Sequence, residues 1–244
     1  MVYQLYYWPS IQGRGEFVRL SLEEAGASYV DVAREAKSSG MAELMRLLKG
    51  RGDPRPPFAP PFLKAGRLVI GQTANILMFL GPRHDLAPKD EAGRLWANQL
   101  QLTVADFVDE VHETHHPIAS GLYYQDQKKE ARRRAFYFLQ DRVPKFLGYF
   151  ESLLSRNSRS DHYLVGAKLS YVDLSLFQVV AGMKYAFPKS MARIARRHRR
   201  LFALHDRVQR RPRIAAYLAS KRRIAFNQDG IFRHYPELDV GSVP

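Results

Sequence analysis

The sequence predicts a two-domain protein in which a small α/β domain is followed by an all-α domain. Short extended segments alternate with short helices over the first eighty residues. After Glu91 no strand pattern is found, and long helical segments take over. We therefore expect βαβ–ββα order in residues 1–82, a linker at 83–90 and helices within 91–244.

The first half of the α/β domain alternates strand and helix. Aromatic and β-branched residues at 2–8 predict a strand, which the following proline ends. Apolar residues at helical spacing from Glu16 onward predict a helix that stops at Gly26. A second strand at 28–32 and a short helix at 41–48 complete a βαβα order.

The second half of this domain is predicted as a hairpin and a helix. Two apolar runs at 62–63 and 68–70 flank a short connection in which Gly66 marks the turn. A helix over 73–80 follows, with Thr73 as its N-cap and the Gly-Pro pair at 81–82 as its end. The domain boundary is expected in the polar, proline-containing segment that comes next.

The second domain is predicted to contain helices alone. Ser170 followed three residues later by Asp173, ahead of an apolar run, has the form of a capping box. The predicted helices lie at about 91–115, 129–154, 170–183, 191–209 and 213–220.

Composition and charge narrow the classes of function. Apolar residues make up 45% and charged residues 25%, which argues against a fibrous or disordered chain. The net charge of +14 favours an anionic partner, and much of the excess lies in 193–200, 207–213 and 221–223. Such a partner can be a small molecule, so the charge alone does not establish nucleic-acid binding.

The chain contains no cysteine, which excludes disulfide scaffolds, thiolate zinc sites, cysteine nucleophiles and CxxC redox chemistry. The N-terminal sequence MVYQLYYWPS lacks the pattern of a signal peptide, and no apolar stretch approaches the roughly 18 residues of a membrane span. We therefore expect a cytoplasmic protein without a membrane partner.

Four features together resemble the cytosolic glutathione transferase family, in its tyrosine-type classes sigma, pi and mu. They are Leu5-Tyr6-Tyr7-Trp8-Pro9 with Gly13-Arg14, the segment from Pro61 to Thr73, the capping motif from Gly166 to Asp173, and the two-domain order. The resemblance implies a thioredoxin-like domain with a helical domain, and a homodimer. It also implies a detoxification enzyme that uses glutathione as cosubstrate and conjugates its thiolate to small apolar electrophiles.

A transferase of this type has to stabilise a thiolate. A free thiol has a pKa of about 8.5, so most of it is protonated at neutral pH. A phenol at the end of the first strand can donate a hydrogen bond to the sulfur, and the N-terminus of the next helix also favours the anion. The resemblance points to Tyr7. Tyr6 and Ser10 are alternatives, because the turn before Gly13 is one residue longer than the family pattern and its alignment is therefore open.

The resemblance assigns glutathione contacts to several residues. Gln72 and Thr73, at a helix start, would receive the γ-glutamyl carboxylate, although Thr73 could be only a cap. Arg14 and, across a dimer interface, Asp106 would contact the same group, with a solvated or structural role equally open. Lys49 is a candidate for the glycyl carboxylate, as is Arg51.

Pro61 corresponds to the cis-proline of the family, whose preceding residue presents its backbone to the cysteinyl part of glutathione. Here that preceding residue is Pro60, which has a carbonyl but no N–H. One of the two backbone hydrogen bonds is therefore lost, and such a bond contributes about 0.5–1.5 kcal/mol. We expect weaker or altered glutathione binding.

The electrophile would lie between the first-strand turn and the helical domain. Trp8, Tyr123 and Tyr124 are the aromatic candidates for lining this pocket, and each could instead be ordinary packing. His112 and His116 are spaced as on a zinc-binding helix, with His115 beside them. Because the HExxH form is absent and no further ligand is evident, we expect no metal site.

A non-catalytic alternative remains open, in which the same fold serves as a binding module. Pro60 and the longer turn favour it, and so does the arginine-rich stretch from Arg193 to Arg223, which could hold an anionic or nucleic-acid partner. A solvated helix face explains this stretch equally simply. We expect nucleic acid not to be the main partner, because most of the glutathione-site residues are present.

Overall fold

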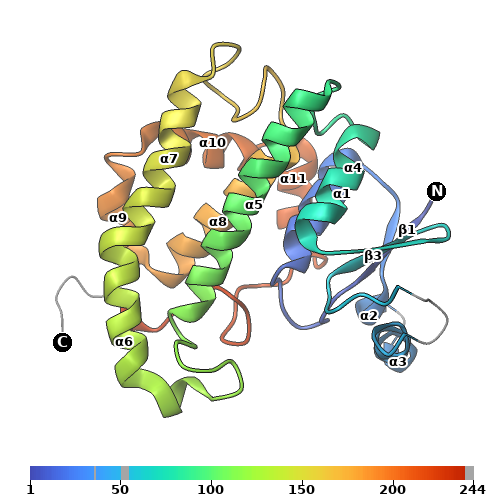
Figure 1. Ribbon diagram of the computed structural model, residues 1–244, viewed down its shortest axis with the longest axis horizontal. Helices are drawn as coiled ribbons and strands as arrows, with labels where there is room; N and C mark the ends of the chain where they lie inside the picture. The colour runs from blue at the N-terminus through green and yellow to red at the C-terminus, as the bar shows by residue number, and fades with distance from the viewer. Residues whose placement is uncertain (36, 51–54, 240–244) are drawn as a thin grey trace.

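The computed structural model describes residues 1–35, 37–50 and 55–239, and it confirms the expected fold class. Figure 1 shows a small mixed sheet with its helices on one side of the molecule and a larger group of helices on the other. Within the described residues, no helix combines the length and apolar character needed to span a membrane.

The sheet contains four strands in the order β2-β1-β3-β4. They are β1 (Tyr3–Tyr6), β2 (Tyr29–Asp31), β3 (Phe62–Ala65) and β4 (Leu68–Gly71). Strand β1 pairs in parallel with β2 and antiparallel with β3, which in turn pairs antiparallel with β4. The β3–β4 turn contains Gly66 at a φ of 63°, a left-handed value that favours glycine. This topology is the predicted βαβ–ββα order.

Helices cover both faces of the sheet. One face packs against α1 (Gly15–Ala25) and α4 (Thr73–Arg83), and the other against α2 (Val32–Glu35) and α3 (Lys37–Leu48). Because successive residues of a strand point to opposite faces, Leu5 joins the core under α1 and α4, whereas Tyr6 joins the core under α2 and α3.

Two predictions about α4 are wrong. Thr73 is the first helical residue, and the N-cap position is occupied by Gln72 without a capping side-chain hydrogen bond. The helix also runs one residue past Pro82 to Arg83. A proline in the last turn removes one backbone hydrogen bond only, so it does not have to end the helix.

The described residues of the second domain form helices joined by loops, without a strand. Its central helix, α8, is buried on almost every side, as expected for the core of a bundle. Its elements are α5 (Glu91–Glu113), η1 (Tyr124–Gln127), α6 (Lys128–Tyr137), η2 (Phe138–Arg142), α7 (Val143–Arg156), α8 (Tyr171–Ala186), α9 (Pro188–Ala195), α10 (Arg199–Gln209), α11 (Pro212–Leu218) and η3 (Pro236–Leu238).

Two of the predicted long helices are divided. The helix expected at 129–154 contains a π-helical turn, η2, one turn before Pro144, whose missing N–H cannot bond to the carbonyl of residue 140. The helix expected at 191–209 breaks at 196–198, although no glycine or proline marks the place. The predicted capping box at α8 is confirmed, because Asp173 accepts hydrogen bonds from the Ser170 N–H and hydroxyl, each at 2.7 Å.

Helix α1 packs against both parts of the molecule. Val18 and Leu22 belong to the core beneath the sheet, whereas Phe17 and Leu20 belong to the core of the helical bundle. The start of α1 is thereby held between the end of β1 and the facing helix α5 (Figure 1). The proposed domain division lies between the end of α4 and the start of α5.

Candidate functional site

Tyr7 directly follows β1, and its ring lies against the start of α1. Its side chain is 4% exposed, and its hydroxyl accepts a hydrogen bond from the Arg14 backbone N–H at 2.8 Å. Two glycines allow this approach. A Cβ at Gly13 would lie 2.0 Å from the Tyr7 hydroxyl, and a Cβ at Gly15 would lie 2.6 Å from the ring. The turn therefore places a phenol at the N-terminal end of a helix.

The surroundings of Tyr7 keep its hydroxyl protonated at neutral pH. Burial raises the pKa of Tyr7, and the opposing effects of the Arg14 N–H and of the Arg14 and Arg19 charges do not cancel it. The Arg19 guanidinium lies 5.7 Å from the centre of the ring. A phenol that accepts one hydrogen bond still has its own proton to donate, so Tyr7 can stabilise an anion but is not a base.

The two alternatives to Tyr7 lie in different surroundings. Tyr6 is 2% exposed and stacks on Phe62 at 4.7 Å between ring centres, on the sheet face that α2 and α3 cover. Ser10 is exposed in the turn after β1, and its carbonyl accepts a hydrogen bond from the Asn227 side chain at 2.8 Å. Of the three candidates, Tyr7 is therefore the one packed against the start of α1.

A cavity of about 340 Å³ opens between α1, α4 and α5. This volume is in the range of small-molecule sites. Apolar side chains of α4 and α5 form part of its wall. Its polar lining comes from Arg14, Gln72, Thr73, Asn75, Asn98, Gln101 and Asp109. The structure thus brings three of the predicted glutathione contacts to one cavity.

At the start of α4, a strained backbone conformation and an unpartnered hydroxyl occur in two residues that line this cavity. Gln72 has a φ of 68° and a ψ of 123°, a conformation that costs a residue other than glycine about 1–3 kcal/mol. The Thr73 hydroxyl is buried and has no hydrogen-bond partner. The first N–H groups of a helix also lack partners within the helix. An anion bound at this position would satisfy these groups.

Arg14 reaches the cavity from α1, but its guanidinium forms an ion pair with Asp109 of α5. Both residues line the cavity. Asp106 lies one turn earlier on the exposed surface of α5 and is not among the lining residues, so its predicted role requires a second copy of the chain. Asp109 was not predicted, although it lies only three residues beyond Asp106.

The Pro60–Pro61 peptide bond is cis, as the resemblance implies, and it leads directly into β3. Neither proline lines the cavity. Lys49 is exposed just after α3, and Arg51 lies outside the described residues. Pro60, Pro61 and Lys49 therefore lie outside the cavity that contains the predicted contacts to the γ-glutamyl group.

The aromatic residues predicted for the electrophile do not meet in a described cavity. Trp8 is 36% exposed beside the turn after β1, whereas Tyr123 is 79% exposed just before η1. Tyr124 is buried, stacks on Tyr235 at 3.7 Å and donates a hydrogen bond to Glu237 at 2.9 Å. Tyr124 is therefore occupied in packing.

The tail segment, residues 224–239, lies between the β1–α1 turn and the helical domain, where the electrophile pocket is predicted. Gln12 in that turn donates a hydrogen bond to the Ile224 carbonyl. Further along, Phe226 stacks on Tyr185 at 4.9 Å, and the ring of Phe232 packs against Gly182 of α8. The aromatic tail therefore packs onto the helical domain.

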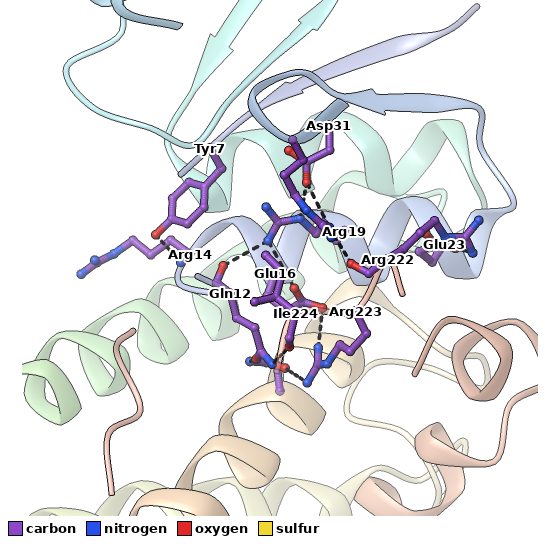
Figure 2. A network of polar contacts seen from close by, with 12 residues as sticks. Tyr7, Gln12, Arg14, Glu16, Arg19, Glu23, Asp31, Arg222, Arg223 and Ile224 are labelled. Atoms are coloured by element: carbon purple, nitrogen blue, oxygen red, sulfur yellow. Dashed lines mark hydrogen bonds and ion pairs between the residues drawn. The ribbon is translucent and has the colours of Figure 1, made fainter. Parts of the chain in front are cut away.

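A buried ionic cluster anchors the start of this tail (Figure 2). Glu16 and Arg19 of α1 are fully buried, with an N–O distance of 3.3 Å between them. Arg19 also pairs with Asp31 at 2.7 Å, and Glu16 pairs with Arg223. The Tyr217 hydroxyl donates to Glu16 at 2.6 Å. These five residues define the cluster.

This cluster was not predicted from the sequence, because its members come from distant segments. Glu16 and Arg19 have the ordinary spacing of an ion pair on a helix surface, and only the packing of the bundle buries them. The tail likewise carries no motif that would indicate its partners. The missed residues are therefore those that depend on long-range contacts.

Comparison with known proteins finds a family match for the helical domain and relatives along nearly the whole chain. The sequence model described as the C-terminal domain of glutathione S-transferase matches residues 112–221. A glutathione S-transferase of Plasmodium falciparum is 24% identical over 222 residues, which cover 89% of this chain and 95% of that protein. Glutathione S-transferase P 1 of Xenopus laevis is 25% identical over 91% of this chain and 93% of its own length.

A solved structure supports the fold. The prostaglandin synthase D of Nilaparvata lugens superposes with a TM-score of 0.69 at 20% identity, and the match covers 91% of this chain and 98% of that one. The match of the helical domain, the relatives along nearly the whole chain and the cis-proline before β3 agree with one another. The helical domain matches the C-terminal domain of the glutathione S-transferases, and the chain is similar to glutathione S-transferases along nearly its whole length.

Proposed function

We propose that this protein is a glutathione transferase that conjugates the glutathione thiolate to small apolar electrophiles. The observation that carries the proposal is the start of α4, where the strained Gln72 and the unpartnered Thr73 hydroxyl line a cavity of suitable size. A strained backbone and an unsatisfied polar group are both costly in a folded protein, and such costs are typical of functional sites. A carboxylate bound here would accept hydrogen bonds from the Thr73 hydroxyl and from the first N–H groups of α4.

In this proposal, glutathione lies across the cavity and the end of β1. Gln72, Thr73 and the N-terminus of α4 hold the γ-glutamyl carboxylate, with the positive charge of Arg14 nearby. The Pro60 carbonyl accepts the one backbone hydrogen bond left to the cysteinyl part. Lys49 is the proposed contact to the glycyl carboxylate, and Asp106 would act from a second copy of the chain.

Tyr7 stabilises the thiolate by donating its hydroxyl proton in a hydrogen bond to the sulfur. Because its pKa is raised, the phenol stays neutral while the thiol loses its proton to solvent. Each unit by which the thiol pKa falls requires about 1.4 kcal/mol of preferential stabilisation of the anion. The sulfur then attacks the electrophilic carbon, a C–S bond forms, and any leaving group departs with the displaced electron pair.

A homodimer in the cytoplasm is part of the proposal. Apolar side chains of α4 and α5 remain exposed, with Met78 at 41% and Leu102 at 51% in the wall of the cavity and Leu95 at 62% outside it. Exposed apolar residues of this size often mark a protein interface. A second copy packed against this surface would lie near the α4–α5 cavity.

The test is calorimetric titration of glutathione into the wild type and two variants of Gln72. We expect Gln72→Ala and Gln72→Gly each to weaken glutathione binding about tenfold, because both lose the side-chain amide. Gln72→Gly should also raise the free energy of unfolding by about 1 kcal/mol, since glycine adopts the observed φ without strain.

The matched control is Gln209→Ala, an exposed glutamine at the end of α10. It should alter neither glutathione affinity nor stability. If the folded wild type does not bind glutathione at millimolar concentration, or if both Gln72 variants bind it as the wild type does, the proposal fails.

A second candidate function is a binding module for an anionic partner. The observation in its favour is a groove of about 680 Å³ whose wall includes Arg193, Arg196, Arg197 and His198. Binding of a labelled oligonucleotide that falls steeply with salt, and that is lost in Arg196→Gln and Arg197→Gln, would support this candidate. Binding of glutathione that depends on Gln72 favours the transferase.

A further inference from the structure

Three histidines meet at the C-terminal end of α5. His112 lies in the last turn of the helix, and His115 and His116 follow where the chain turns away. Each ring can offer one nitrogen, and these nitrogens all lie within 4.8 Å of one another. The ring centres are 4.8–5.0 Å apart. These three residues are named the histidine cluster below.

His115 is the fixed member of the cluster. Its side chain is 1% exposed, and its Nε2 lies 2.8 Å from the Ile231 carbonyl of the tail. A carbonyl can only accept, so Nε2 carries the proton in this contact. The neutral ring then has its lone pair on Nδ1, and this atom is buried without a hydrogen-bond partner. A hydrogen bond that fixes the tautomer in this way is typical of histidines that bind metals.

We propose that His112, His115 and His116 form a site for one divalent transition-metal ion of the zinc type. Three imidazole nitrogens suit zinc, copper, nickel or cobalt rather than calcium or magnesium. A Zn–N bond of about 2.0–2.1 Å requires nitrogens about 3.3 Å apart in a tetrahedral site. His112 and His116 are half-buried, and rotation of their rings would bring the nitrogens to this spacing. His116 would bind through Nε2, because its Nδ1 lies 3.3 Å from the side-chain nitrogen of Gln127, which donates to it. The fourth position is open to water.

The spacing of His112 and His116 alone led to the opposite expectation, because no third ligand could be identified. His115 becomes the third ligand only because α5 ends at Glu113 and the chain then folds back. The tail adds the carbonyl that orients the ring. A lone pair on a buried nitrogen cannot bind an anion, so the cluster favours a cation even though the whole chain is basic.

The charged groups around the cluster determine how tightly it can bind a cation. The positive charge of Arg233, on the tail, acts on all three rings and opposes a positive ion there, and the charge of Arg14 has the same effect at His112. Asp109 acts in the favourable direction. The Arg233 side chain is held by the Gly230 carbonyl at 2.8 Å. Removal of the Arg233 charge should therefore strengthen metal binding.

None of the three histidines lines the α4–α5 cavity, so the metal site lies outside the proposed glutathione site, although Arg14 and Asp109 line that cavity and also act on His112.

The experiment is a titration of metal-free protein with Co²⁺, followed by visible absorption, and with Zn²⁺, followed by calorimetry. We expect one ion per chain. His112→Gln and His116→Gln should each weaken binding about tenfold or more, whereas His162→Gln, at an exposed histidine outside the cluster, should leave it unchanged. Arg233→Gln should tighten binding about 2- to 10-fold.

The variants are compared by circular dichroism and thermal unfolding in the presence of EDTA, so that a misfolded protein is recognised. If one cluster variant does not fold, the other decides. The proposal is overturned if the folded wild type binds no ion at neutral pH, or if the cluster variants and His162→Gln bind equally. Glutathione titration of His116→Gln should match the wild type, which separates this site from the proposed transferase site.

Discussion

The two sides of α1 differ in how their polar groups are satisfied. On the side of Tyr7 and Arg14, the helix faces an open cavity where the Thr73 hydroxyl has no partner. On the other side, Glu16 contacts Arg19, Arg223 and Tyr217 within the buried cluster (Figure 2). The same helix therefore borders an open cavity with an unpartnered hydroxyl of α4 at one side and uses its charges to hold the tail at the other.

The largest effect is expected from breaking the closed side. In Glu16→Gln, Arg19 and Arg223 lose the carboxylate that they share, and two buried guanidinium groups are left undercompensated. Breaking a buried ion pair destabilises a protein by about 3–5 kcal/mol. We expect a loss of this size in the free energy of unfolding, measured by urea denaturation with glutathione absent.

An ion pair between the same helix and an exposed arginine is the control. Glu23 of α1 pairs with Arg222 at 2.9 Å, and the Arg222 side chain is 61% exposed, whereas that of Glu23 is 9% exposed. Arg222→Ala should therefore cost at most about 1 kcal/mol. Equal losses in the two variants would mean that the buried cluster does not stabilise the fold more than a surface pair does.

On the open side, Tyr7→Phe should cause the next largest effect. Loss of one hydrogen-bond donor to a developing anion lowers kcat by about 100-fold or more. The pKa of bound glutathione should rise, which ultraviolet absorption of the thiolate measures as a function of pH. Tyr6→Phe, in the sheet core, should keep most of the activity. If Tyr6→Phe instead gives the larger loss, the assignment of Tyr7 is wrong.

The smallest effect is expected at Pro60. Pro60→Val restores a backbone N–H beside the cis-proline, and we expect glutathione to bind about 2- to 10-fold more tightly, since one hydrogen bond contributes about 0.5–1.5 kcal/mol. Calorimetry measures this change. An unchanged or weaker affinity would show that this N–H does not reach the peptide.

The features that local sequence determines could be predicted. The capping box of α8 depends on two residues three positions apart, and the structure confirms it. The cis bond before Pro61 and the positions of Gln72 and Thr73 at the start of α4 also lie within one short motif. Thr73 was nevertheless wrongly predicted as the cap, because the strained φ of Gln72 moves the first helical residue.

The features that depend on distant segments could not be predicted. Asp109 pairs with Arg14 across 95 positions, and Arg223 pairs with Glu16 across 207. No periodicity indicates such partners, because each residue alone has the pattern of a solvated charge. The tail, which lies where the electrophile pocket was expected, belongs to the same class.

The packing of the tail on the helical domain depends on the contact between Phe232 and Gly182. A Cβ at position 182 would lie 2.3 Å from the ring, closer than any real contact allows. One methyl group on the central helix would thus displace the ring, although position 182 lies outside both the cavity and the tail. The position of the tail can therefore be changed by natural variation or by design, while Tyr7 and the residues that line the α4–α5 cavity stay the same.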